Sequence, residues 1–277
     1  MRSIAVCLVA ASLIWVATRT FPTTSFSAPA AAAVKDDVTE SKPQPVLVEL
    51  FTSEGCSNCP TADRFLVQLQ KLQPVAGVEI IALGQHVDYW NGRGWVDPYS
   101  SAQFSARQHD YAGTFGNDGV YTPQMIVDGQ DEFVGSDRER ALEAIADSAR
   151  KPKASVQISR ADASGQAGGK PFTLQVRAEG LDRAGSHEWA DVWLAITEDD
   201  LDSRVGRGEN AGRRLQHVAV VREMRAIGKV EPVPRAVFSS ETLVTPRREW
   251  NRGKLRAVVF VQGRRTKRIL GAAALQL

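Results

Sequence analysis

Cysteine is scarce in this chain: three cysteines in 277 residues are too few for a disulfide-rich scaffold or for a four-cysteine zinc site. The chain also lacks an excess of charge of one sign, because a formal net charge of +2 at pH 7 gives it no general attraction for nucleic acid. Long hydrophobic runs are missing too, since the apolar stretch Ile4–Ala17 is shorter than the roughly 20 residues of a membrane-spanning helix. What remains is the composition of an ordinary globular protein, long enough for two domains.

The N-terminus has the pattern of an export signal. A positive charge at Arg2 precedes the apolar run, and small-residue cleavage candidates follow at residues 28–30 and 31–33. The sequence predicts a cleaved signal peptide over residues 1–33 and a periplasmic or secreted location, with an uncleaved N-terminal anchor as the alternative. The mature chain then keeps only Cys56 and Cys59, in a compartment where a disulfide persists.

Strand and helix patterns alternate in the first half of the mature chain, after a polar, proline-containing stretch predicted as a linker over residues 34–45. The predicted elements are strand 46–51, helix 61–72, strand 78–83, helix 99–111, strand 124–127, strand 132–134 and a helix behind the capping box of Ser136 and Glu139. From residue 153 onward, short strand patterns alternate with glycine-rich turns, at 155–159, 172–178, 191–197, 215–221, 255–261 and 269–275. The second half therefore predicts an all-β sandwich.

The two mature cysteines form a C-x-x-C motif between strand 46–51 and helix 61–72. At a helix N-terminus, unpaired N–H groups and the helix dipole stabilise a thiolate, which is the reactive form of cysteine. We therefore predict that Cys56 is an exposed attacking thiol and that Cys59, one turn further on, resolves the mixed disulfide. The alternatives are a structural disulfide and half of a metal site.

Thr122-Pro123 stands directly before strand 124–127. Thioredoxin-like folds place a cis-proline at this point, facing the cysteine pair, so Thr122 and Pro123 are predicted to position a substrate chain beside Cys56; an ordinary turn proline is the alternative. The order of elements as a whole is that of a thioredoxin-like fold. The predicted fold class is an α/β thioredoxin-like domain over residues 46–152, followed by an all-β sandwich domain over residues 153–277.

Further candidate residues lie close to the cysteines or follow the second predicted strand. The carboxyl ends of parallel strands line the sites of open α/β sheets, which places His86 and Asp88 on the same side as Cys56. His86 is a candidate proton shuttle or metal ligand, with a hydrogen-bonded loop histidine as the alternative. Trp90 is predicted to form part of an apolar wall around the disulfide; the alternative is that it only packs against the neighbouring predicted helix. Glu54, if it lies close to Cys56, would oppose formation of the thiolate.

The chain resembles a bacterial secreted thioredoxin-like family known as domain of unknown function 1223. The stretches that carry the resemblance are VELFTSEGCSNCPTAD (48–63), LGQHVDYWNGRGWVDP (83–98), RQHDYA (107–112), VYTPQMIVDG (120–129) and GENAGRRLQHVAVVREM (208–224). The resemblance implies a thioredoxin-like fold and export, but it supplies no reaction. Thioredoxins typically carry Trp-Cys-Gly-Pro-Cys, so the residues Gly55 to Cys59 of this chain leave the reduction potential open.

Three functions fit these residues. The first is an exported thiol–disulfide oxidoreductase, or a redox accessory protein, with no cofactor beyond its disulfide and with exported proteins or small thiols as partners. The second is a periplasmic protein that binds copper or zinc through Cys56, Cys59 and His86, since thiolates suit Cu(I). The third is a non-catalytic binding module. Nothing in the sequence resembles a nucleic-acid-binding module, and the direction of electron transfer and the oligomeric state stay open.

Overall fold

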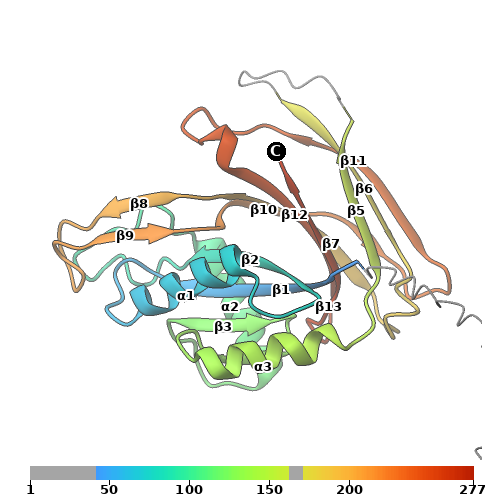
Figure 1. Cartoon of the computed structure of the whole chain (residues 1–277), viewed down its shortest axis with the longest axis horizontal. Helices are drawn as coiled ribbons and strands as arrows, with labels where there is room; N and C mark the ends of the chain where they lie inside the picture. Colours follow the sequence, from blue (N-terminus) through green and yellow to red (C-terminus); the bar gives the residue numbers. More distant parts are fainter. Residues whose placement is uncertain (1–41, 162–170) are drawn as a thin grey trace, which may run out of the picture. The chain divides into compact units, whose positions relative to one another are not determined.

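In a computed structural model, residues 42–161 and 171–277 are described, and contacts join Ser41–Leu277 into one unit (Figure 1). The predicted signal peptide, residues 1–33, lies outside the described residues, as does most of the predicted linker, residues 34–45. The last two linker residues begin the first strand. In the described part of the chain, no helix has the length and apolar character needed to cross a bilayer.

The first half follows the predicted order of elements. These are β1 (Gln44–Thr52), α1 (Cys59–Leu72), β2 (Val78–His86), α2 (Ala102–Phe115), β3 (Gln124–Val127), β4 (Asp131–Val134) and α3 (Arg138–Ala149). The start of α3 differs in detail from the capping-box prediction. Its N-cap is Asp137 rather than Ser136, because the Asp137 carboxylate accepts a hydrogen bond from the backbone N–H of Arg140 at 3.1 Å.

Side chains of β1 alternate between the two faces of the sheet. Val46, Val48 and Leu50 pack in one core with residues of α1 and α3, whereas Leu47 packs in another core with Phe104 of α2. The helices α1 and α3 therefore cover one face of this strand, and α2 covers the other.

The second half consists of strands and one short 3-10 helix among its described residues. They are β5 (Ser155–Arg160), β6 (Phe172–Glu179), β7 (Ala190–Glu198), β8 (Leu201–Arg204), β9 (Arg214–His217), β10 (Val220–Val230), β11 (Val237–Val244), η1 (Arg252–Lys254), β12 (Leu255–Gly263) and β13 (Ile269–Gln276). The predicted strand 215–221 is interrupted at Ala219, which has a left-handed φ of 49°, and becomes the separate strands β9 and β10. Strands β8 and β11 were not predicted.

The two halves share one eight-stranded mixed sheet with the order β13-β12-β7-β10-β2-β1-β3-β4. The junction is the pairing of β10 with β2, where Val220 lies opposite Gly84 in parallel register. The backbone N–H of Gly84 donates to the carbonyl of Ala219 at 2.8 Å. A Cβ on Gly84 would lie only 3.2 Å from the carbonyl oxygen of Val218, so glycine permits this close approach of the two chain segments.

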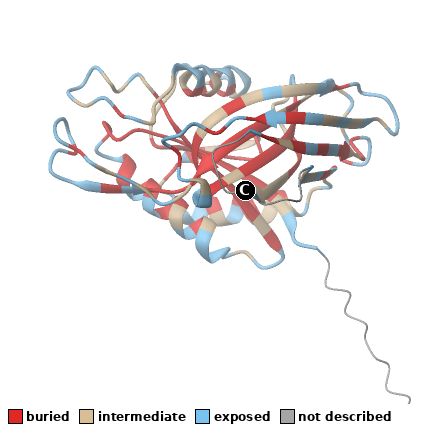
Figure 2. Ribbon diagram, turned by 90° about the horizontal axis from the view of Figure 1, so that it is seen from above, coloured by how far each residue is buried: buried red, intermediate tan, exposed pale blue. Residues whose placement is uncertain are grey.

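One hydrophobic core also crosses the predicted domain boundary. It combines Leu47 and Ile81 of the first half with Val221, Met224 and Phe260 of the second half. Figure 2 shows the buried residues concentrated in the strands, with exposed residues along the outer sides of the helices.

The predicted fold class, an α/β thioredoxin-like domain followed by an all-β sandwich domain, is therefore wrong. Strands β7, β10, β12 and β13 extend the sheet of the first half instead of forming a separate sandwich. Strands β5, β6 and β11 form a three-stranded sheet, and β8 and β9 form a two-stranded sheet. The predicted domain bounds, 46–152 and 153–277, stay predictions; α3 ends and β5 begins on either side of residue 152.

Candidate functional site

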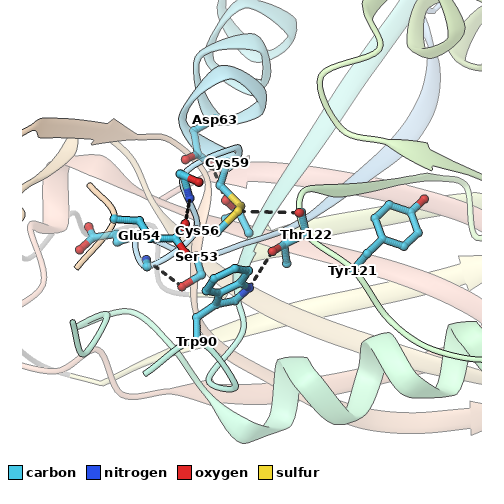
Figure 3. The surroundings of a disulfide bond; sticks show 12 residues. Ser53, Glu54, Cys56, Cys59, Asp63, Trp90, Tyr121 and Thr122 are labelled. Carbon is cyan, nitrogen blue, oxygen red and sulfur yellow. Dashed lines mark hydrogen bonds between the residues drawn. A yellow bond between two sulfur atoms is a disulfide. The ribbon is translucent and has the colours of Figure 1, made fainter. Parts of the chain in front are cut away.

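Cys56 and Cys59 form a disulfide between the end of β1 and the first turn of α1, with their Cα atoms 5.4 Å apart (Figure 3). Cys59 begins the helix, so the helix starts two residues earlier than predicted. The prediction that the pair lies within disulfide reach is confirmed. The expected exposure of Cys56 is wrong, because Cys56 is 1% exposed and Cys59 is fully buried, whereas Ser57 and Asn58 between them are exposed.

Thr122 and Trp90 lie against the disulfide, as Figure 3 shows. The carbonyl oxygen of Thr122 is 3.7 Å from Sγ of Cys56, and the peptide bond from Thr122 to Pro123 is cis. The indole Nε1 of Trp90 donates to the Thr122 hydroxyl at 2.8 Å, which fixes the ring beside the pair. The structure thus brings Cys56, Cys59, Thr122 and Trp90 together.

Glu54 lies two residues before Cys56 and is completely buried. Its carboxylate accepts a hydrogen bond from Nε1 of Trp95 at 2.7 Å, and its other oxygen lies 3.0 Å from Nε2 of the buried His217. The carboxyl group of Glu54 is therefore held between an indole and an imidazole inside the protein.

His86 is buried and paired with a carboxylate, not free. Its Nδ1 lies 2.7 Å from Oδ2 of Asp97. Burial alone would lower the pKa of His86, but Asp97, together with Asp63 and Glu54, outweighs burial and raises it. Burial would raise the pKa of Asp97, but His86 and the backbone N–H groups of Glu54 and Tyr99 together lower it. Asp97 also accepts the backbone N–H groups of Glu54 at 2.8 Å and Tyr99 at 2.9 Å, so the pair fixes the chain just before the cysteines.

Asp88 serves a different part of the structure. Its carboxylate accepts the Ser105 hydroxyl at 2.5 Å, and its own backbone N–H donates to the same hydroxyl at 3.1 Å. These contacts tie the loop after β2 to α2. These hydrogen bonds of Asp88 therefore do not involve the cysteines, Thr122 or Trp90.

A loop of the second half also holds the cysteine motif, which the sequence analysis missed. The buried amide Nδ2 of Asn210 donates to the carbonyls of Glu54 and Cys56, both at 2.8 Å. The Glu209 carboxylate accepts the backbone N–H of Ser57 at 3.1 Å. Both residues, together with His217, lie in the stretch 208–224 that carries the family resemblance, and that was the signal that could have revealed them.

A buried carboxylate on α1 is a second feature that the sequence analysis missed. Asp63 is 6% exposed, and its Oδ1 accepts the Thr52 hydroxyl at 2.7 Å. Its Oδ2 has no hydrogen-bond partner among the described residues. Burial raises the pKa of Asp63, against the opposing influence of the imidazoles of His217 and His86.

The metal-binding alternative gains no support. Within residues 42–161 and 171–277, no group of three or more His, Cys, Asp or Glu side chains is arranged to hold a metal ion. In this structure the two sulfurs are bonded to each other, and Nδ1 of His86 contacts Asp97.

A sequence model of the family described as protein of unknown function DUF1223 matches residues 47–262. A crystal structure of an Agrobacterium tumefaciens protein superposes with a TM-score of 0.61 at 23% identity, covering 85% of this chain and 95% of that protein. HBP35 of Porphyromonas gingivalis superposes with a TM-score of 0.60 at 13% identity, covering 86% of this chain and 76% of that protein. At such identities the likeness concerns the fold alone. The search of curated proteins finds no significant match.

Proposed function

The chain belongs to the DUF1223 family of proteins of unknown function, and from its own site we propose that it is an exported thiol–disulfide oxidoreductase or redox accessory protein that uses Cys56 and Cys59. The observation that carries the proposal is the disulfide at the β1–α1 junction, with the Thr122 carbonyl 3.7 Å from Sγ of Cys56. Export would deliver this pair to a compartment that maintains disulfides.

The exchange reaction follows from the chemistry of the pair. A thiolate of the substrate attacks Sγ of Cys56, a substrate–Cys56 bond forms, and the bond to Cys59 breaks, which leaves the Cys59 sulfur reduced. A second substrate thiolate then attacks the mixed disulfide, so that the substrate leaves as a disulfide and the protein holds two reduced cysteines. The substrate dithiol is oxidised by two electrons and the protein pair is reduced by two; the reverse sequence reduces a substrate disulfide.

The roles of the neighbouring groups rest on their contacts. Thr122 and Pro123 position the substrate chain, because they are next to the sulfur that is attacked. Asn210 holds the backbone of residues 54 to 56 against movement, because a single amide binds two of its carbonyls. The sulfurs are buried, so a substrate reaches Cys56 from the side of the exposed Ser57 and Asn58. Exported proteins and small thiols are the substrate classes that suit such a pair.

Trapping tests the proposal. In Cys59→Ser, the mixed disulfide on Cys56 has no internal thiol to resolve it, so we expect covalent adducts of the variant with exported proteins or with glutathione to accumulate. Cys56→Ser is expected to form few, since it lacks the attacking sulfur. Non-reducing gels and mass spectrometry of the alkylated proteins measure both. The double variant Cys56→Ser/Cys59→Ser is the background control, and adducts equal to that background in Cys59→Ser would remove the proposal.

A further inference from the structure

Asp63 lies on the same face of α1 as the second cysteine of the pair. It follows Cys59 by four residues, and side chains at this spacing are neighbours on a helix surface, with Cβ atoms about 5–6 Å apart. Both residues are buried. Figure 3 shows Asp63 and Cys59 close together at the start of α1.

The carboxyl group of Asp63 is only partly satisfied. One oxygen accepts the Thr52 hydroxyl at 2.7 Å, and the other has no hydrogen-bond partner in the described part of the chain. A buried carboxylate with an open oxygen is costly when ionised, so burial favours the protonated form of Asp63 and raises its pKa. A carboxyl group of this kind can act as both a proton donor and a proton acceptor.

The charged groups that face Asp63 come from several elements. The imidazoles of His217 on β9 and His86 on β2 favour the ionised form of Asp63, and Asp97 opposes it. Each imidazole is itself paired with a carboxylate, His217 with Glu54 and His86 with Asp97. Desolvation remains the largest influence on the carboxyl group.

A cavity connects Asp63 with the surface. It has a volume of about 160 Å³ and is lined by Pro60, Asp63 and Arg64 of α1 and by the three residues 214–216 of β9. This volume accommodates several water molecules, each of which takes up about 30 Å³ in the liquid. Asp63 thus lies four residues after Cys59 on α1 and lines this cavity.

We propose that Asp63 is the proton donor and acceptor for Cys59, and that it exchanges its own proton with solvent through this cavity. The assignment rests on the proposed thiol–disulfide exchange. When a substrate thiolate attacks Cys56, the bond between the two sulfurs breaks, and the leaving Cys59 sulfur takes the proton of Asp63. The Asp63 carboxylate regains a proton from water in the cavity. In the opposite direction, the carboxylate removes the proton of Cys59 as its sulfur attacks the mixed disulfide.

The test is the pH dependence of the reduction of the Cys56–Cys59 disulfide by dithiothreitol, with each rate divided by the concentration of dithiothreitol thiolate at that pH. In the wild type, this normalised rate is expected to fall as pH rises and Asp63 loses its proton. In Asp63→Asn it is expected to be independent of pH and about 100-fold below the wild type on the low-pH side of the wild-type midpoint, the lower end of typical general-acid effects. At pH 10 the two proteins should agree.

Two further variants separate a proton-transfer role from a merely structural one. Thr52→Val keeps the carboxylate but removes the hydrogen bond that favours its ionised form, so the midpoint of the wild-type profile is expected to move to higher pH. Asp128→Asn is the control for loss of a buried aspartate elsewhere: its carboxylate binds the backbone N–H of Leu47, the hydroxyl of Ser148 and the ammonium group of Lys153, at the opposite end of β1 from the cysteines. Its normalised profile is expected to follow that of the wild type.

The outcomes distinguish this assignment from the proposed function. A folded wild-type protein whose disulfide resists dithiothreitol at every pH would remove the proposed function, and the assignment of Asp63 with it. A wild type that is readily reduced, together with an Asp63→Asn profile that matches it within twofold, would overturn the assignment alone. If Asp63→Asn does not fold, the direction of the Thr52→Val shift decides, because an unchanged midpoint or a shift to lower pH would contradict the proposal.

Discussion

Cys56→Ser is expected to lose dithiol–disulfide turnover by a factor on the order of 10³ or more, since removal of an attacking nucleophile typically costs at least this much. A hydroxyl group is too weak a nucleophile at neutral pH to replace a thiolate, and the remaining Cys59 has no partner with which to form the internal disulfide. The measurement is the rate at which the protein catalyses electron transfer between a dithiol and a disulfide substrate, with circular dichroism to verify the fold.

The matched control for this prediction is Cys7→Ser, the same chemical change in the predicted signal peptide. It is expected to leave the turnover of the exported protein unchanged, because the mature chain would not contain residue 7. Turnover in Cys56→Ser that stays within tenfold of the wild type would contradict the role given to Cys56. If Cys7→Ser reduced turnover as strongly as Cys56→Ser does, this result would contradict the choice of Cys56 and Cys59 as the reactive pair.

The second large effect concerns stability: Arg107→Ala is expected to lower the free energy of unfolding by about 3–5 kcal/mol, the usual cost of leaving a buried charge without its partner. The Arg107 guanidinium binds both carboxylate oxygens of the buried Glu49, at 2.6 and 2.9 Å. The Gln85 amide donates to the same carboxylate at 2.6 Å, and the Tyr111 hydroxyl donates to it as well. Gln262 of β12 accepts from Arg107 at 3.0 Å, so this network also joins the two halves of the chain.

Denaturant unfolding measures the effect of Arg107→Ala. The control is Arg140→Ala, because Arg140 is 44% exposed and contacts Asp131 and Glu143 at the surface, where such pairs contribute about 1 kcal/mol or less. Adding Glu49→Gln to Arg107→Ala should restore part of the loss, since it removes the unpaired charge. Equal losses in Arg107→Ala and Arg140→Ala would show that the buried network does not stabilise the fold as described.

Much of the first half could be predicted from local sequence. The apolar runs of β1 and β2 and the helical spacing of apolar residues in α1 depend on residues close together in the chain, and these elements appear within a few residues of their predicted bounds. The assembly of the second half could not be predicted in this way. The second half joins the sheet of the first half where Val220 pairs with Gly84, more than a hundred residues earlier in the chain. The alternation of apolar and polar residues within a strand does not indicate which distant strand it will pair with.

The same distinction applies to the site. The C-x-x-C motif and Thr122-Pro123 were visible because they are short patterns, and the structure places them together. Asn210 and His217 were missed because they act on residues about 150 positions earlier, across the sheet junction. Asp63 was missed for another reason: an aspartate on a helix is normally exposed, and only the packing of α1 against β9 turns it inward.

The most direct test of the central claim is a redox titration of the folded wild-type protein. The protein is equilibrated with dithiothreitol or glutathione buffers of known potential, and free thiols are counted by alkylation while near-ultraviolet circular dichroism monitors the fold. The account predicts one two-electron transition that exposes the thiols of Cys56 and Cys59 at a potential between roughly −270 and −120 mV, the range of thiol–disulfide oxidoreductases. A disulfide that stays intact down to about −300 mV, or that is reduced only when the protein unfolds, would be structural and would contradict it.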